Sequence, residues 1–373
     1  MAARLGILPI QRTRLRPVGI FCHPFAVMID ARLSVFQGVG QPFAFVAHPV
    51  GAAPGPGECL VQISLASVCG SDLHTVDGRR SGPTPVVLGH EGVGRVLAVG
   101  SGRETGLVGR RVTWTLADSC GVCRCCREWD LPQKCERLFK YGHAPFHDGT
   151  GLNGTYASHV LLRAGTTVRP LPETVTDEMA VSANCALATM VGAVEGLGGP
   201  GELAVIQGAG LLGLYGCALL KELGWRRVVV VDTNPARLEL VTDFGGEPAL
   251  NSACSVVPSG TADAVFEVTG QGAVIAEGLD LLRPRGRYQW VGMVHAASRF
   301  ELVGEVVVRK CLTIQGLHNY VPRHLGAAVE FLQRQGARLP WERLISPALP
   351  LESLDAAMAL ARTGRWARVA VRP

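Results

Sequence analysis

Five of the chain's twelve cysteines lie within sixteen residues, at a spacing that suits a metal ion better than disulfide bonds. Cys120, Cys123 and Cys126 are separated by two-residue gaps, and Cys135 follows. Four thiolates close a tetrahedral zinc site and leave no position for a substrate, so this zinc would be structural. Cys125 competes with Cys126 as a ligand, and buried cysteines without a metal are the other interpretation. Thiols at metal spacing indicate a reducing compartment.

A second set of metal-binding residue types is dispersed along the chain. Cys69 opens the sequence Cys-Gly-Ser-Asp-Leu-His, His90 precedes Glu91, and Cys185 lies in Asn-Cys-Ala. Two thiolates and one imidazole would hold zinc and leave its fourth position open for water or substrate, as in a catalytic site. Each residue alone is more often a core cysteine or an ordinarily hydrogen-bonded histidine. The polar neighbours favour chemistry: Ser71, Asp72 and His74.

A glycine-rich segment matches the G-x-G-x-x-G pattern of dinucleotide-binding turns: Gly208, Ala209, Gly210, Leu211, Leu212 and Gly213. It follows a predicted strand at 203–206 and opens a predicted helix that runs to Gly224. Gly208 would make the tight turn, Gly210 would admit a pyrophosphate to the backbone, and Gly213 would let helix and strand pack closely. The helix N-terminus at Leu211 and Leu212 would add partial positive charge. A turn without a ligand is the alternative.

An acid at the end of the next predicted strand, 228–231, indicates which dinucleotide binds. Asp232 stands 19 residues after Gly213. Its carboxylate would accept hydrogen bonds from the adenosine ribose and repel a 2′-phosphate, which favours NAD over NADP. Arg237 could serve a 2′-phosphate, but beside Asp232 we expect it to lie over the ribose. Further along, Val291 and Gly292 suit backbone contact with the nicotinamide, with an ordinary turn as the alternative.

Two kinds of domain have to position these residues. Residues 28–100 alternate short apolar runs with Gly and Pro, which predicts a β-rich, barrel-like domain. After about residue 186, predicted strands alternate with helices, which is the order of βαβ units and predicts a parallel sheet. These strands are at 203–206, 228–231, 264–268 and 288–291. Segments 325–332 and 354–360 predict helices that return to pack elsewhere.

Composition and charge exclude several functional classes. With 47% hydrophobic and 18% charged residues, the chain is typical of globular proteins. Its net charge is +5, but four arginines and no acid lie in residues 1–27, so the remainder has no electrostatic footprint for nucleic acid or anionic membranes. The uncharged stretch 203–220 has barely the length of a membrane span, and its glycine turn favours a strand, turn and helix. Residues 1–27 fit no targeting signal well, and we expect a disordered leader from an upstream start codon; a targeting leader is the alternative.

Together these motifs resemble the zinc-containing medium-chain alcohol dehydrogenase family, from about Val35 to Val371. Cys69 and His90 are 21 residues apart and Cys120 follows 30 later, as the family pattern expects. The resemblance implies an α/β fold: a GroES-like β-rich catalytic domain at 28–186 and 320–373, with a structural-zinc lobe at about 118–137, and a Rossmann doubly wound parallel-sheet domain at 187–319. The active site would lie between them. One departure is the gap of eight residues between Cys126 and Cys135, where the family usually has seven.

The resemblance also implies a role for each site residue. Cys69, His90 and Cys185 would bind a catalytic zinc, the four lobe cysteines a structural zinc, and the Rossmann domain NAD. Asp72 would orient His90, and Glu91 would lie behind the metal. Ser71 would take the substrate's hydroxyl proton and pass it, through the cofactor ribose, towards His74. The family further implies a homo-oligomer, either a dimer or a tetramer.

A narrower resemblance is to the branch of this family that is associated with phosphonate catabolism. It rests on segments 131–135, 140–143, 184–186 and 316–320 and implies a small alcohol that carries an anionic group. In the family, the chain beyond the zinc lobe returns towards the cleft, where Lys140 and His143 would face that anion. The alternative is that both are solvated loop residues.

We therefore expect a cytoplasmic, zinc-dependent oxidoreductase that transfers hydride from a small-molecule alcohol to NAD⁺, with no nucleic-acid or membrane partner. Zinc would act as a Lewis acid that lowers the pKa of the alcohol. One alternative is an NADPH-dependent aldehyde or ketone reductase, against which Asp232 argues. Another is a non-catalytic, zinc-stapled nucleotide-binding module, which would have no use for Ser71 and His74 beside an open metal position.

Overall fold

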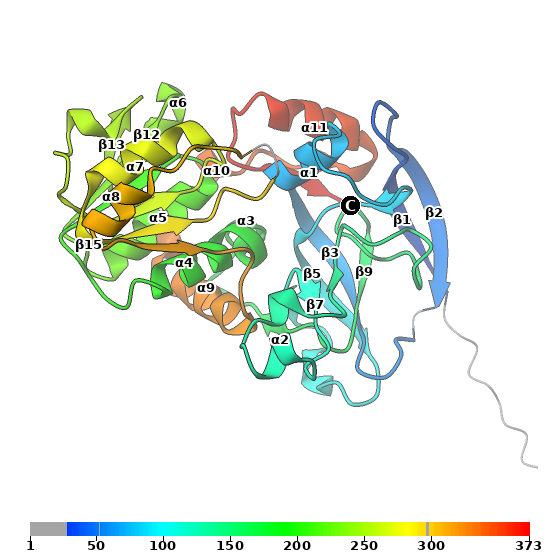
Figure 1. The fold of residues 1–373 in the computed structure, drawn as a ribbon. Coiled ribbons are helices and arrows are strands. Elements are labelled where there is room, and N and C mark those ends of the chain that lie inside the picture. Colours follow the sequence, from blue (N-terminus) through cyan, green and yellow to red (C-terminus); the bar gives the residue numbers. More distant parts are fainter. Residues whose placement is uncertain (1–27, 52, 296–297) are drawn as a thin grey trace, which may run out of the picture.

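The structure is a computed structural model that describes residues 28–51, 53–295 and 298–373. The leader predicted at 1–27 lies outside the described residues. Figure 1 shows a β-rich part on one side and a layered sheet with helices on the other. Within those ranges, no helix has both the length and the apolar character that a membrane crossing requires.

The β-rich part contains a three-stranded sheet, ordered β2-β1-β4, and a seven-stranded sheet along the path β10-β6-β5-β3-β18-β17, with β9 paired to β3. Strand β3 (Cys59–Val68) pairs antiparallel with β5 (Glu91–Val99) and with β18 (Val369–Arg372). The end of the chain thus completes the sheet to which β3 belongs. The other strands are β1 (Met28–Phe36), β2 (Ala44–Gly51), β4 (Val86–Val87), β6 (Arg111–Trp114), β9 (His159–Leu162), β10 (Val168–Pro170) and β17 (Leu349–Pro350).

The other part is a six-stranded, all-parallel sheet in the order β13-β12-β11-β14-β15-β16, which confirms the predicted βαβ organisation. Its strands are β11 (Leu203–Gln207), β12 (Arg227–Asp232), β13 (Glu247–Leu250), β14 (Ala262–Glu267), β15 (Leu282–Trp290) and β16 (Thr313–Gly316). All of β11 is buried, as expected of a central strand covered on both faces. The chain steps outward from β11 to β13 and then returns to β14. Ligands bind at such a reversal, beyond the carboxyl ends of the strands.

Helices cover the parallel sheet and join it to the β-rich part (Figure 1). They are α3 (Asp177–Ala180), α4 (Ala188–Glu195), α5 (Leu211–Glu222), α6 (Pro235–Leu238), α7 (Ile275–Leu281), α8 (Gly304–Arg309), α9 (Pro322–Gln335) and α10 (Trp341–Leu344). Helix α11 (Leu354–Arg362) packs instead on β18 of the β-rich part. Helices α9 and α11 confirm the helices predicted at 325–332 and 354–360. One cluster of buried apolar residues contains Leu65 and Val93 of the β-rich part together with Ile206 and Leu325. The two parts therefore share a core.

Candidate active site and metal lobe

Three separate stretches of chain bring a thiol, an imidazole and a second thiol to one place. Cys69 caps helix α1 (Gly70–Val76), directly after β3 ends. His90 directly precedes β5, and the antiparallel pairing puts the start of β5 beside the end of β3. Cys185 lies in a π-helical turn, η3 (Ala183–Leu187), a distortion that is frequent at functional sites.

The ligand atoms of Cys69, His90, Glu91 and Cys185 all lie within 4.8 Å of one another. Cys185 Sγ is 3.5 Å from His90 Nε2. Zinc binds thiolate sulfur at about 2.3 Å and imidazole nitrogen at about 2.0 Å, so tetrahedral ligands are separated by roughly 3.5 to 3.8 Å. The donor set and this spacing therefore fit zinc, and the structure brings together the three residues that the sequence nominates as its ligands.

Asp72 fixes both ends of this arrangement and is itself 2% exposed. Its Oδ2 accepts hydrogen bonds from the Cys69 N–H at 2.9 Å and from the Tyr156 hydroxyl at 2.8 Å. Its Oδ1 lies 3.5 Å from His90 Nδ1, an ion-pair distance rather than a full hydrogen bond. Asp72 thus faces His90 Nδ1, the ring nitrogen that stays free if Nε2 binds a metal. A carboxylate in this position orients the imidazole ring. Sequence reasoning did not find Tyr156, which lies 84 residues away.

Glu91 is fully buried and is held by a residue that sequence reasoning also missed. Arg368 donates to both Glu91 carboxylate oxygens, at 2.8 and 2.9 Å, and its Nη2 lies 3.7 Å from Cys69 Sγ. Ser67 donates to the same carboxylate at 2.5 Å. Glu91 and Arg368 therefore balance each other's charge behind the thiols. In the sequence, Arg368 stands out only as a charged residue directly before the buried strand β18. Nothing in the sequence indicates that Glu91 is its partner.

The electrostatics of the three ligands favour the metal-binding protonation state at Cys69, whereas they raise the pKa of both His90 and Cys185. A hydrogen bond from Cys185 lowers the pKa of the Cys69 thiol well below its usual value despite burial, and Arg368 and His90 add to this effect. Burial lowers the pKa of His90, but Asp72 and Cys69 outweigh it and raise that pKa to about 10. The Cys69 thiol therefore ionises readily to the thiolate, which is the form that binds a metal.

Ser71 and His74 lie one helical turn apart on α1, so their side chains share a face. His74 is half-buried, and burial, followed by Arg79 and His295, lowers its pKa, which keeps the ring neutral. The His74 and His295 ring centroids are 5.2 Å apart. Because His295 follows β15 of the parallel sheet, this contact places the metal-binding segment against the carboxyl edge of that sheet.

The four cysteines at 120, 123, 126 and 135 also converge, around the short helix α2 (Arg124–Arg127) and the turn η2 (Pro132–Lys134). Cys123 Sγ lies 3.4 Å from Cys126 Sγ and 3.9 Å from Cys135 Sγ. Backbone N–H groups of Val122 and Cys123 lower the pKa of Cys120 to about 6. Cys125 groups instead with Cys123 and Glu136, so the geometry selects Cys126 for the set of four. The extra residue before Cys135 does not prevent convergence.

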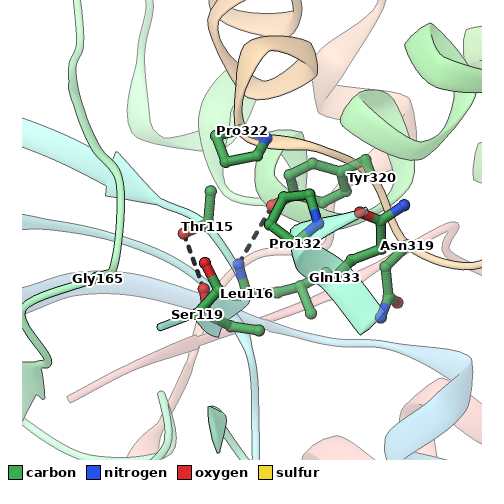
Figure 2. Close-up of a pocket in the computed structure, with 10 residues that line it drawn as sticks. Thr115, Leu116, Ser119, Pro132, Gln133, Gly165, Asn319, Tyr320 and Pro322 are labelled. Carbon is green, nitrogen blue, oxygen red and sulfur yellow. Dashed lines mark hydrogen bonds between the residues drawn. The ribbon is translucent and has the colours of Figure 1, made fainter. Parts of the chain in front are cut away.

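This lobe packs on the segment that follows β16. Figure 2 shows a small pocket between Pro132 and Gln133 of the lobe and Asn319, Tyr320 and Pro322. The Tyr320 hydroxyl accepts from the Leu116 N–H at 3.2 Å and donates to the Asn184 carbonyl at 2.5 Å. Asn184 precedes Cys185, so Tyr320 connects the surroundings of the lobe to the turn that carries a catalytic-site thiol.

The glycine turn has the shape that a dinucleotide requires. Gly208 has φ +116°, a conformation that favours glycine. A Cβ on Gly213 would lie only 1.9 Å from the Gly208 carbonyl oxygen, so the helix could not pack there with any larger residue. A Cβ on Gly210, the N-cap of α5, would meet no atom within 4 Å, which leaves open space before the helix N-terminus. Leu211 and Leu212 form the first turn of that helix.

The remaining cofactor candidates surround this turn. Asp232 ends β12, and its carboxylate accepts from the Ala209 N–H and the Asn234 N–H, both at 2.8 Å. Arg237 is exposed and lies 3.9 Å from Asp232. Strand β15 ends at Trp290, one residue before the end predicted at Val291, so Val291 and Gly292 come directly after it.

A fully buried acid that sequence reasoning missed fixes the loops after β14 and β15. Glu267 accepts from the N–H groups of Thr269, at 2.5 Å, and Gly270, at 2.6 Å, through one oxygen. Its second oxygen accepts from the Gly292 N–H at 3.1 Å. The Glu267 carboxylate thereby sets the backbone on which a nicotinamide would rest. An acid at the end of an apolar strand was its only sequence signal.

Lys140 and His143 lie beside the metal-binding set and are half-buried, so they are not freely solvated loop residues. The His143 and His90 ring centroids are 5.8 Å apart. Burial lowers the pKa of Lys140, Arg80 lowers it further, and the Cys185 and Cys69 thiols oppose the change. Arg80, which was not found from the sequence, is therefore near enough to Lys140 to affect its pKa.

Comparisons with known proteins agree with this geometry. Residues 55–173 match the family described as "Alcohol dehydrogenase GroES-like domain", and residues 212–334 match "Zinc-binding dehydrogenase". A "Probable zinc-binding alcohol dehydrogenase" of Mycobacterium tuberculosis is 30% identical, over 92% of this chain and 88% of that protein. The 5-exo-hydroxycamphor dehydrogenase of Pseudomonas putida is 27% identical, over 83% and 90%. The crystal structure of an alcohol dehydrogenase from Thermotoga maritima has a TM-score of 0.85 at 29% identity and covers 92% of this chain and 100% of that one.

Proposed function

Because this chain belongs to the zinc-containing medium-chain alcohol dehydrogenase family and is a zinc-dependent oxidoreductase, we propose that it oxidises an alcohol to an aldehyde or ketone with NAD⁺ as the hydride acceptor. One observation carries the proposal. The segment with Cys69 and His74 meets the carboxyl edge of the parallel sheet, where the His74 and His295 rings are 5.2 Å apart. The metal-binding set therefore lies at the same edge of the parallel sheet as the glycine turn that follows β11.

In this proposal Cys69, His90 and Cys185 hold the catalytic zinc, whose chemistry is to lower the pKa of an alcohol as a Lewis acid. Asp72 holds His90 and the Cys69 backbone in place. Glu91, neutralised by Arg368, fills the space behind the thiols without adding a net charge that would compete for the metal. The four lobe cysteines hold a second, structural zinc.

Proton release is assigned to helix α1. The Ser71 hydroxyl lies at the start of the helix; as it accepts the proton that the alcohol loses, it would donate its own proton onward, through the cofactor ribose, towards His74 on the same face of the helix. The lowered pKa of His74 suits this role, because a neutral imidazole is able to accept a proton. Glu267 keeps Gly270 and Gly292 fixed, which would give a bound nicotinamide ring a rigid backbone to rest on.

The preference for NAD⁺ is assigned to Asp232. Two backbone N–H groups anchor its carboxylate beside the glycine turn, where a 2′-phosphate would be repelled. The competing function is an NADPH-dependent carbonyl reductase, in which Arg237 would bind that phosphate. Arg237 is directed at Asp232 instead, at 3.9 Å.

The test is NADH formation from a panel of alcohols, with bound zinc quantified on the same sample and NADP⁺ as the comparison cofactor. We expect turnover with NAD⁺ that depends on zinc, and kcat/KM for NAD⁺ at least about tenfold above that for NADP⁺, the worth of one lost charge-assisted contact. A higher kcat/KM with NADP⁺ would contradict the cofactor assignment. Zinc-loaded protein that binds NADH but turns over no alcohol or carbonyl compound would contradict the enzymatic one.

A further inference from the structure

We propose that Tyr320 is a positioning residue for the catalytic zinc and that it acts through Asn184, the residue before the ligand Cys185. The two residues form a clamp, the Tyr320–Asn184 clamp, which fixes Cys185 and His90 relative to each other. The proposal rests on the proposed catalytic zinc site and identifies what holds two of its three ligands in place.

Asn184 is fully buried and is bonded to the surroundings of both ligands. Its side-chain Nδ2 donates to the His90 carbonyl oxygen at 2.9 Å, and its own carbonyl oxygen accepts from the Tyr320 hydroxyl at 2.5 Å. Cys185 is the next residue in the chain, and its Sγ lies 3.5 Å from His90 Nε2. A shift of Asn184 would therefore change the separation of a thiol and an imidazole that have to meet one metal ion.

The backbone around Cys185 needs support from outside its own turn. Cys185 lies in the π-helical turn η3, and such turns are rare because they interrupt the regular α-helical hydrogen-bond pattern. Contacts from other elements therefore decide whether the turn keeps its shape. Tyr320 supplies one of these contacts from a position 136 residues further along the chain.

The hydrogen bonds of the Asn184 amide indicate that it serves His90. Among the residues that the structure describes, Asn184 Oδ1 has no hydrogen-bond partner, although this atom is buried. A buried polar atom without a partner costs free energy, which an apolar residue of similar size would avoid. The reverse orientation of the amide would put Oδ1 against the His90 carbonyl oxygen, so Nδ2 is the atom that faces His90. The bond to His90 is thus what an asparagine contributes at this position.

The Tyr320 hydroxyl is fixed on two sides and so provides a firm anchor for Asn184. The Tyr320 side chain is 4% exposed, and burial raises the pKa of its hydroxyl, which stays protonated and able to donate. Besides donating to Asn184, the hydroxyl accepts from the Leu116 N–H at 3.2 Å (Figure 2). Leu116 directly precedes β7 (Ala117–Asp118), which pairs with β8 (Phe139–Lys140). The clamp is therefore anchored on the β-rich part.

Tyr320 itself is contributed by the segment that leaves the parallel sheet. After β16, the Leu317 N–H donates to the Trp290 carbonyl at 2.9 Å, at the end of β15. Asn319 then has φ +61°, a left-handed conformation that asparagine adopts more readily than most residues, and Tyr320 follows. The clamp therefore connects two zinc ligands to the edge of the sheet at which the dinucleotide is proposed to bind.

The test measures the affinity of both zinc sites in Tyr320→Phe and Asn184→Leu by competition titration with a chelator. Tyr320→Phe removes the hydroxyl and keeps the ring, and Asn184→Leu removes the bond to the His90 carbonyl and keeps a side chain of similar size. We expect the affinity for the catalytic zinc to fall roughly 10- to 100-fold in each variant, the usual effect of losing a partner that orients metal ligands. The lobe zinc should keep its affinity within about threefold, because none of its ligands is bonded to the clamp.

Tyr141→Phe is the matched control. Tyr141 is also fully buried, and its hydroxyl also has two partners, the Thr166 hydroxyl and the Arg163 N–H. Neither partner is hydrogen-bonded to a ligand of the catalytic zinc, so this variant should lose a comparable amount of stability and keep its catalytic-zinc affinity. NADH binding, measured by fluorescence, should stay within about threefold in all three variants.

The outcomes separate this proposal from the proposed oxidation. Unchanged zinc affinity in Tyr320→Phe and Asn184→Leu, equal weakening of both zinc ions, or the same loss in Tyr141→Phe would overturn the positioning role and leave the oxidation standing. A larger rise in the NADH Kd of Tyr320→Phe would also overturn it, since the residue would then act on the dinucleotide site. If the catalytic zinc weakens as expected while the unmodified protein oxidises no alcohol, the oxidation fails and the positioning role stands.

Discussion

The two metal-binding regions use the same ligand chemistry in opposite ways. The four thiols of the lobe come from sixteen consecutive residues, and three of these four cysteines are half-buried. The candidate catalytic set takes two thiols and an imidazole from positions spread over more than a hundred residues, and it has three buried members when Glu91 is included.

The difference lies in what surrounds the ligands. Around the lobe sulfurs, the donors are backbone N–H groups, such as those of Cys120 and Arg137 at 3.3 Å. Around the catalytic set, the neighbours are side chains from distant elements: Asp72, Tyr156, Glu91 and Arg368. Backbone donors fix four sulfurs and close a site. Side-chain partners orient three ligands and leave room for a reaction.

The largest effect should come from removing a ligand of the catalytic set. Cys185→Ser is expected to lower kcat at least about a thousandfold, because Lewis-acid stabilisation contributes several kcal/mol. NADH binding, measured by fluorescence, should remain within about threefold, since the glycine turn lies on another element. Loss of both turnover and NADH binding would show that the two sites are not separable.

Removal of the Ser71 hydroxyl should have the next largest effect. Ser71→Ala is expected to lower kcat about a hundredfold, the scale of one positioned proton-transfer group, while both zinc ions stay bound. Stopped-flow kinetics with zinc analysis provides the measurement. An unchanged rate would remove Ser71 from the proton path, and zinc loss would reassign it to the metal site.

Asp72→Asn should have a smaller effect, because Asp72 acts through His90 and the Cys69 backbone. We expect a 10- to 100-fold loss of activity or catalytic-zinc affinity. A competition titration with a chelator separates this from a folding defect, since only one zinc per chain should bind more weakly. Equal weakening of both zinc ions would contradict the assigned role.

The lobe should respond in stability more than in chemistry. Cys126→Ser is expected to lower Tm by about 5 °C or more, since losing a structural zinc costs several kcal/mol and each is worth roughly 2 °C or more in a large domain. The kcat of the folded fraction should fall less than about tenfold. Cys125→Ser is the matched control and should retain both zinc ions. If Cys125→Ser loses the lobe zinc while Cys126→Ser retains it, Cys125 is the ligand.

How much the sequence could predict differs between these regions for a physical reason. Ligands of the lobe are local, so their spacing alone indicates a metal. The strand, the glycine turn, the helix and the acid that follows them also lie close together in the sequence. Gly208, Gly213 and Asp232 lie where the dinucleotide-binding pattern requires. The parallel sheet and the two C-terminal helices were predicted for the same reason.

Long-range partners could not be found in this way. Arg368 lies 277 residues from Glu91, and Tyr320 lies 136 residues from Asn184, so no periodicity or motif connects them. Glu267 was simply part of the predicted strand 264–268, and no motif singled it out. Their roles follow from the antiparallel β3–β5 pairing, the return of the chain to β18, and the packing of the lobe on the segment after β16.

The central claim is that chemistry depends on the zinc held by Cys69, His90 and Cys185 and not on the zinc of the lobe. The most direct measurement is stepwise zinc removal from the Cys126→Ser variant, whose remaining zinc is the catalytic one, with alcohol-dependent NADH formation followed at each step. The account predicts that turnover falls in proportion to bound zinc and returns when zinc is restored. Undiminished turnover by metal-free protein would contradict it.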